Sequence, residues 1–141
     1  MQHCGKLPQV EWDLFFPEVS KLKVQAANVR CHAHGSDVFL ATLAQCDGIV
    51  ANAGHSLLAE AMYLGIPVLA LPLKLYEQQL NALMVASHSF GMLVDQFDRE
   101  KAHEFVARLE YFAGEIASDT SVLIRGDGVS TVLEELDCYL A

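Results

Sequence analysis

The chain carries a short polar loop, Asn52-Ala-Gly-His-Ser56, between an apolar segment and a segment with helical periodicity. Gly54 lets a ligand approach the backbone without a Cβ in the way, and the amides of residues 55–57 would be free at a helix start, where anions bind. Glu60 follows Ser56 by four residues and so lies on the same helix face, about 6 Å further along. This spacing suits a phosphate at the helix start and a ribose diol at the carboxylate. The alternative is an N-cap serine and an acid favoured by the helix dipole.

A second polar cluster follows the next apolar segment and consists of Glu77, Gln78 and Asn81. Their spacings of four and three residues place them on one face at the start of a predicted helix. A carboxylate beside amides matches the vicinal hydroxyls of a sugar, because together they offer several hydrogen-bonding groups. The alternative is an ordinary polar helix start, with Glu77 favoured by the helix dipole.

The elements that must position these loops alternate between strand and helix. Strands are predicted at residues 11–16, 28–33, 48–51, 67–72 and 91–94. Helices are predicted at residues 37–44, 56–64, 76–89, 99–113 and 128–140, the first beginning at Ser36 or Asp37. We expect inner faces made of Val38, Leu40, Leu43 and Ala44 in the first helix and of Val129, Val132, Leu133 and Leu136 in the last.

This alternation, with short links, predicts a Rossmann-like α/β domain, a parallel sheet with helices on both faces. The segment 67–72 is apolar throughout and lies between two prolines, which is typical of a buried parallel strand. In such sheets ligands bind outside the carboxyl ends of the strands. Both polar loops are therefore expected at the same edge of the sheet.

The composition narrows the class of protein. The chain has 141 residues, 52% of them hydrophobic, and a formal net charge of −9. These values fit a single domain over residues 1–141 and exclude disorder, and the negative charge repels nucleic-acid phosphates. No apolar run approaches the ~20 residues that cross a bilayer, and the first residues lack the pattern of a signal peptide. We therefore expect a cytoplasmic protein that neither spans a membrane nor binds nucleic acid.

The cysteines and histidines do not form the spacing of a metal or redox site. His32 and His34 would share one face of a strand, where two imidazoles can bind a metal, but no third ligand lies nearby in sequence, so strand-end histidines are the simpler interpretation. His55 beside Ser56 lacks an acid at triad-like spacing, so no hydrolase triad is expected. No C-x-x-C pair occurs among Cys4, Cys31, Cys46 and Cys138, and buried reduced thiols of a cytoplasmic protein are expected at Cys31 and Cys46, which have apolar neighbours in sequence.

Taken together, the two loops resemble the donor-nucleotide half of a GT-B glycosyltransferase. The resemblance is to the UDP-glycosyltransferase group, which includes the bacterial enzyme that adds N-acetylglucosamine to the peptidoglycan lipid precursor. It covers about residues 28–95 and rests on Asn52-Ala-Gly-His-Ser-Leu-Leu-Ala-Glu60, Leu64-Gly-Ile-Pro67, Pro72 and Glu77-Gln78-x-x-Asn81-Ala82. It implies the C-terminal half of a GT-B fold that lacks its first strand–helix unit.

The resemblance also implies roles for individual residues. In the family, the counterparts of Gly54, His55 and Ser56 hold the diphosphate, and that of Glu60 binds the ribose hydroxyls. Those of Glu77 and Gln78 hold the donor sugar, and Asn81 completes that block. Asn52 stands where plant-type members have histidine. Leu57 replaces the usual serine or threonine, so Ser56 or backbone amides would have to bind the phosphate. The implied ligand is a nucleoside-diphosphate sugar, a UDP-sugar by the family; no cofactor, metal or catalytic residue is implied.

In the family, the acceptor site and any general base belong to an N-terminal domain, which residues 1–141 do not contain. We therefore expect a glycosyltransferase donor half that is inactive without an N-terminal domain or partner, and an exposed sheet edge that favours such a partner or a homodimer. The first alternative is a non-catalytic nucleotide-sugar-binding or interaction module. The second is a relative of the nucleotide-sugar epimerases, whose usual Asp-Ser-Gly-Gly loop differs from Asn52-Ala-Gly-His. The sugar, the base and the acceptor stay open.

Overall fold

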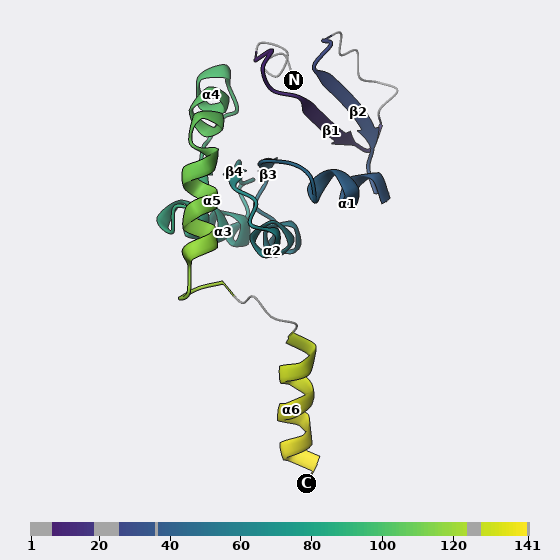
Figure 1. The fold of residues 1–141 in the computed structure, drawn as a ribbon, viewed down its shortest axis with the longest axis vertical. Coiled ribbons are helices and arrows are strands. Elements are labelled where there is room, and N and C mark those ends of the chain that lie inside the picture. Colours follow the sequence, from purple (N-terminus) through teal and green to yellow (C-terminus); the bar gives the residue numbers. More distant parts are fainter. Residues whose placement is uncertain (1–6, 19–25, 36, 124–127, 141) are drawn as a thin grey trace.

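A computed structural model describes residues 7–18, 26–35, 37–123 and 128–140 (Figure 1). Cys4 and Ser36, discussed above, lie outside these residues. The elements alternate as predicted, and each predicted strand is present. In chain order they are β1 (Trp12–Phe16), β2 (Val29–Ala33), α1 (Asp37–Leu43), β3 (Ile49–Ala51), α2 (His55–Leu64), β4 (Val68–Ala70), α3 (Tyr76–Ser87), β5 (Gly91–Leu93), α4 (Arg99–Ala107), α5 (Leu109–Ser118) and α6 (Gly128–Leu140).

All strand pairings in the described residues are parallel, as predicted, but they form two sheets. One sheet has the order β3-β4-β5, and the other is the pair β1-β2. The single continuous sheet expected from the sequence is therefore divided between β2 and β3. The described ladder hydrogen bonds of β3 go to β4, and those of β2 go to β1.

The main core lies on the two faces of β4. Val68 and Ala70 face one hydrophobic cluster, which contains residues of α2 and α3, and Leu69 between them faces a second cluster with Phe105 of α4 and Phe112 of α5. All three strand residues are fully buried. Helices thus cover both faces of this sheet, which confirms the predicted Rossmann-like α/β class. In the segment 67–72, residues 67–70 are buried as predicted, while Leu71 and Pro72 are half-buried.

Helix α1 turns a different face inward than predicted. Leu43 is buried, but Val38 is 48% and Leu40 is 58% exposed. Phe39 packs against the first cluster instead, and its ring meets that of Phe15 edge-on at 5.0 Å. Phe39 and Leu43 are four residues apart and share one face, so the aromatic contact with β1 sets the rotation of this helix.

The segment predicted as one helix over residues 99–113 is divided into α4 and α5. Arg108 separates them, with φ −113° and ψ 7°. Its guanidinium carbon lies 4.5 Å from the ring centroid of Phe112 and 5.5 Å from that of Tyr111. Phe105 of α4 and Phe112 of α5 both pack in the second cluster, with ring centroids 6.0 Å apart.

Helix α6 has the predicted bounds, but its apolar face is not an inner face. Val132, Leu133 and Leu136 are about half exposed, and Val129 is 62% exposed. Figure 1 shows the reason: α6, in yellow, stands apart from the other described elements, so none of them covers this face. No helix in the described part of the chain is long and apolar enough to cross a membrane.

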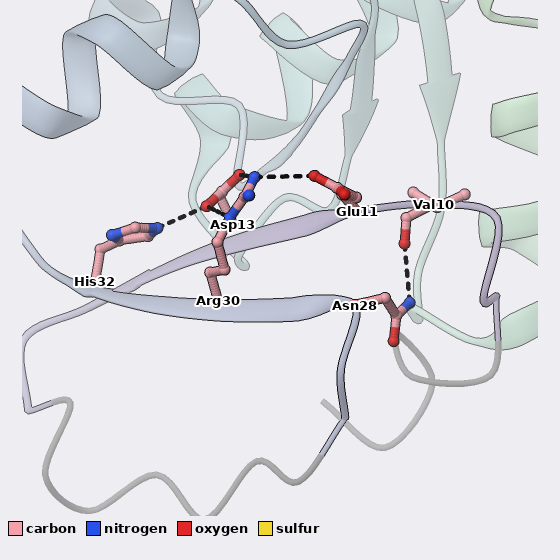
Figure 2. A network of polar contacts seen from close by, with 6 residues as sticks. All are labelled: Val10, Glu11, Asp13, Asn28, Arg30 and His32. Carbon is pink, nitrogen blue, oxygen red and sulfur yellow. Dashed lines mark hydrogen bonds and ion pairs between the residues drawn. The ribbon is translucent and has the colours of Figure 1, made fainter.

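A charged network joins β1 to β2 (Figure 2). The Arg30 guanidinium donates to both carboxylate oxygens of Asp13 at 2.9 and 2.8 Å, and Nε2 of His32 donates to Oδ1 of Asp13 at 2.6 Å. Glu11 adds an ion pair with Arg30 at 3.2 Å. The Arg30 hydrogen bond in particular lowers the pKa of Asp13 from 3.8 to about 2. His32 therefore helps to hold β1 and β2 together in their observed register.

We predict that Asp13→Asn destabilises the chain by about 1 kcal/mol at pH 7, because it removes a charge-assisted hydrogen bond to a partly exposed arginine. The carboxyl pKa is lower in the folded chain than in the unfolded one, so its contribution is present above pH 3.8 and is lost as the pH falls toward 2. Urea unfolding at pH 7 and pH 3 tests this. The difference between wild type and variant should shrink at pH 3, while Glu11→Gln should change little. An equal difference at both pH values would contradict the prediction.

Candidate functional site

The structure brings the two polar loops of the sequence together at the carboxyl ends of β3 and β4. Nδ1 of His55, the first residue of α2, lies 2.9 Å from Oε1 of Glu77 in the first turn of α3. The amide nitrogen of Asn81 donates to the carbonyl oxygen of Ala53 at 3.0 Å. Residues 22 and 28 positions apart are thus in direct contact. The rule that ligand loops follow parallel strands predicts this meeting.

The N-terminus of α2 offers free backbone donors. Gly54 is its N-cap and makes no side-chain capping bond, and the first helical amide to be bonded is that of Leu58, to the Gly54 carbonyl at 3.1 Å. The amides of residues 55–57 have no acceptor among the described residues, and the helix dipole makes this end positive. Ser56 is the second helical residue, so it is not the N-cap. Its hydroxyl lies 3.5 Å from Nε2 of His55.

The backbone before α2 has an unusual conformation at Ala53, where φ is 60° and the residue is fully buried. An L-residue with a Cβ is strained in this left-handed region, and the hydrogen bond from Asn81 helps to hold it there. Gly54 itself is extended, with φ −65° and ψ 138°. A Cβ on Gly54 would meet no atom nearer than Asn52 Oδ1 at 3.9 Å. The side of the loop that a ligand would approach is therefore open.

The remaining predicted site residues differ in how far they are engaged. Glu60 is exposed on α2, one turn after Ser56, and has no hydrogen bond or ion pair within the described ranges. Gln78 accepts a hydrogen bond from the Leu73 amide at 2.9 Å, so it closes the loop between β4 and α3. Glu77 is paired with His55 at the surface. The carboxylate of Glu60 is thus the group that is ready to accept hydroxyls.

A cleft of about 530 Å³ lies at the carboxyl ends of β3, β4 and β5. Of the predicted site residues, Asn52 alone is among the described residues that line it. Sequence reasoning missed the segment 95–97, which follows β5, although the same rule about strand ends could have found it. The lining residues are Val50, Ala51, Asn52, Leu71, Pro72, Leu73, Asp95, Gln96 and Phe97.

The described residues hold no group of three His, Cys, Asp or Glu side chains that could bind a metal ion. Cys31, Cys46 and Cys138 are free thiols. Burial raises the pKa of the Cys46 thiol, which also donates to the Leu43 carbonyl at 3.3 Å. The groups gathered at the candidate site are backbone amides, carboxylates and side-chain amides.

Residues 17–110 match the model of the family described as Glycosyl transferase family 1. No curated protein sequence is significantly similar to the chain. The match includes both polar loops and the strands that precede them, and it ends within α5.

Solved glycosyltransferase structures share the fold. The glycotransferase of kitacinnamycin superposes with a TM-score of 0.70 at 20% identity, over 82% of this chain and 31% of that one. The spinosyn forosaminyltransferase SpnP gives 0.67 at 22% identity, over 82% and 32%. The spinosyn rhamnosyltransferase SpnG gives 0.66 at 22% identity, over 82% and 33%. This chain thus spans about a third of the length of these GT-B structures, as the predicted resemblance to one half of such a fold implies.

Proposed function

The chain belongs to glycosyl transferase family 1, and on that premise we propose that it binds the nucleoside-diphosphate sugar from which a sugar is transferred to an acceptor hydroxyl. The observation that carries the proposal is the joining of the two loops by Asn81 to Ala53 and by His55 to Glu77, beside the uncapped start of α2. Backbone N–H groups that can bind an anion therefore lie close to carboxylates that can accept hydrogen bonds from hydroxyls.

We assign the donor's parts as follows. The diphosphate binds the amides of residues 55–57, assisted by His55 and Ser56, because unbonded amides and the helix dipole both favour negative charge. Glu60, one turn along α2, accepts the two ribose hydroxyls. Glu77 and Gln78 lie on the sugar side and exchange their present partners for sugar hydroxyls. Uridine is the expected base.

The same end of α2 supports a mechanism for bond cleavage. As the bond between sugar and diphosphate breaks, negative charge builds up on the leaving phosphate, and preoriented amide donors stabilise it without having to reorganise. The acceptor hydroxyl needs a base, and none of the residues assigned above has that role. We therefore propose that transfer requires an N-terminal domain, supplied by a partner or by a longer chain; the alternative is a homodimer.

Calorimetric titration with UDP, GDP and dTDP tests the donor site, and an assay of sugar transfer by the purified chain tests the need for a partner. We expect saturable binding of one nucleotide and no measurable transfer. Activity that appears on adding an N-terminal domain would exclude the alternative of a non-catalytic binding module. Flat titrations with all three nucleotides would contradict the proposed donor site, and robust turnover by the chain alone would contradict its dependence on a partner.

Asn81 is predicted to act on the nucleotide through the loop that it holds. Asn81→Ala should weaken UDP binding about fivefold, the effect of losing one hydrogen bond of about 1 kcal/mol. Adding Ala53→Gly should recover part of the loss, because glycine adopts a positive φ without strain. Calorimetry on the two variants measures both effects. If Asn81 instead contacts the sugar directly, UDP affinity will stay at the wild-type value and only UDP-sugar affinity will fall.

A further inference from the structure

We propose that Ser56, His55 and Glu77 form a nucleophile–base–acid triad that hydrolyses small carboxylic esters. This activity goes beyond the proposed donor binding and does not depend on it. Nε2 of His55 lies 3.5 Å from the Ser56 hydroxyl, and Nδ1 of the same ring lies 2.9 Å from Oε1 of Glu77. The sequence predicts no triad because no acid follows His55 at a suitable spacing, but the fold supplies one from α3, 22 positions away.

The contact with Glu77 fixes which nitrogen of His55 can act as a base. An ionised carboxylate only accepts hydrogen bonds, so Nδ1 carries the proton and donates it to Oε1. In the neutral ring Nε2 is then the acceptor, and it faces the Ser56 hydroxyl. When His55 takes the serine proton it becomes positively charged, and the adjacent Glu77 carboxylate stabilises that charge.

The distance of 3.5 Å between Ser56 and His55 is at the outer limit of a hydrogen bond. Both side chains are exposed, so the serine hydroxyl can turn toward Nε2. In enzymes without substrate, the hydrogen bond between nucleophile and base is often long, and it shortens when the substrate binds. The observed geometry is therefore that of a triad before substrate binding.

The nucleophile lies next to hydrogen-bond donors for the charge that develops on an ester. Ser56 lies just after β3, in the first turn of α2. Hydrolases with a parallel sheet place their nucleophile at such a strand-to-helix turn, and the amide of the next residue binds the oxyanion. Here the next residue is Leu57, and the amides of residues 55–57 have no acceptor among the described residues. An oxyanion can thus bind there without displacing an existing contact.

The reaction proceeds in two balanced steps. Oγ of Ser56 bonds to the carbonyl carbon of the ester while its proton moves to Nε2 of His55. The bond from that carbon to the alcohol oxygen then breaks, and the alcohol leaves with the proton from Nε2, so that Ser56 carries the acyl group. In the second step water gives a proton to Nε2 and its oxygen bonds to the acyl carbon. Oγ of Ser56 leaves with that proton, and the carboxylic acid is released.

The exposure of the triad determines the class of substrate. His55 is 78% and Glu77 is 62% exposed, and a Cβ on Gly54 would meet no atom nearer than 3.9 Å. The site therefore has room for a small ester but offers little apolar surface to a long acyl chain. Esters suit it better than amides, because an alcohol is the better leaving group and requires less stabilisation by a water-excluded site.

Labelling of the full chain with a fluorophosphonate, followed by mass spectrometry of its peptides, tests the proposal together with hydrolysis of p-nitrophenyl acetate. We expect the label on Ser56 and no label on Ser56→Ala. His55→Gln should slow hydrolysis about hundredfold, the contribution of a general base. Glu77→Gln keeps an oxygen that accepts from Nδ1 but removes the charge, so it should slow hydrolysis about fivefold. A purely structural Glu77 would leave that rate unchanged.

Ser87→Ala is the matched control. Ser87 and His88 are also neighbours in sequence, but they lie at the C-terminal end of α3. The Ser87 hydroxyl donates to the Met84 carbonyl at 3.0 Å, and no carboxylate of the described residues is paired with His88. Ser87→Ala should therefore leave both the labelling of Ser56 and the rate of hydrolysis unchanged.

Adding UDP separates this inference from the proposed function. A nucleotide at the amides of residues 55–57 should slow the labelling of Ser56, because it occupies the oxyanion site. Labelling of Ser56 together with flat nucleotide titrations would support the triad and contradict the donor site. Nucleotide binding without a label on Ser56 would overturn the triad alone, as would equal rates of hydrolysis by Ser56→Ala and wild type.

Discussion

Replacing Gly91 by alanine is expected to destabilise the chain by about 3 kcal/mol or more. The added methyl group would clash with backbone atoms, which cannot move aside as a flexible side chain can. Gly91 is the first residue of β5 and is paired with Val68 in the buried strand β4. A Cβ at this position would lie 1.9 Å from the Val68 carbonyl oxygen and 2.7 Å from its carbonyl carbon. The substitution must therefore push β5 away from β4, at the centre of the sheet that carries the site.

Gly114→Ala is the matched control for this substitution. Gly114 lies inside α5, and a Cβ there would meet nothing within 4 Å. Alanine should stabilise the chain by about 0.5–1 kcal/mol, because it restricts the unfolded backbone and favours the helix. Urea unfolding followed by circular dichroism measures both variants. Equal stabilities would show that β4 and β5 do not approach as closely as the structure has them.

The sequence reveals the elements well, because hydrophobic period and glycine or proline boundaries are local signals. It does not reveal which tertiary contacts rotate or interrupt a helix. Arg108 lies in a segment predicted as one helix, yet the helix is interrupted there, and the Arg108 guanidinium lies over the ring of Phe112. Likewise Phe39, not Leu40, faces inward in α1 because Phe15 of a distant strand meets its ring. The sequence shows that residue 91 is a glycine, but it does not show that the Val68 carbonyl lies where the Cβ of any other residue would be.

The candidate site likewise has features that the sequence predicts and features that depend on tertiary contacts. The motif loops and their shared edge follow from strand order and local residue types. The bond between Asn81 and Ala53 does not, since it depends on the left-handed backbone of a non-glycine residue. The segment 95–97 carries no motif and becomes visible only once β5 is placed beside β4. Local patterns thus locate the loops, and tertiary structure decides which of their groups remain free.

Glu60→Ala is expected to weaken UDP binding ten- to hundredfold, which corresponds to about 1.5–3 kcal/mol for hydrogen bonds to a charged group. Glu60 is exposed on α2 one turn beyond the free amides, and within the described ranges no partner competes for its carboxylate. Two ribose hydroxyls can therefore donate to it without displacing a protein contact. Calorimetric titration of wild type and variant with UDP measures the effect.

The sign of this effect separates a direct contact from long-range electrostatics. Removing a carboxylate from a chain with net charge −9 should by itself favour an anionic ligand, so a loss of affinity requires a contact made by that carboxylate. Glu110→Ala, in the first turn of α5, makes the same charge change on another exposed helix residue and should leave UDP affinity unchanged or slightly higher. Glu60→Gln keeps one acceptor oxygen and should lose less than Glu60→Ala. If Glu60→Ala behaves like Glu110→Ala, the ribose does not bind at α2.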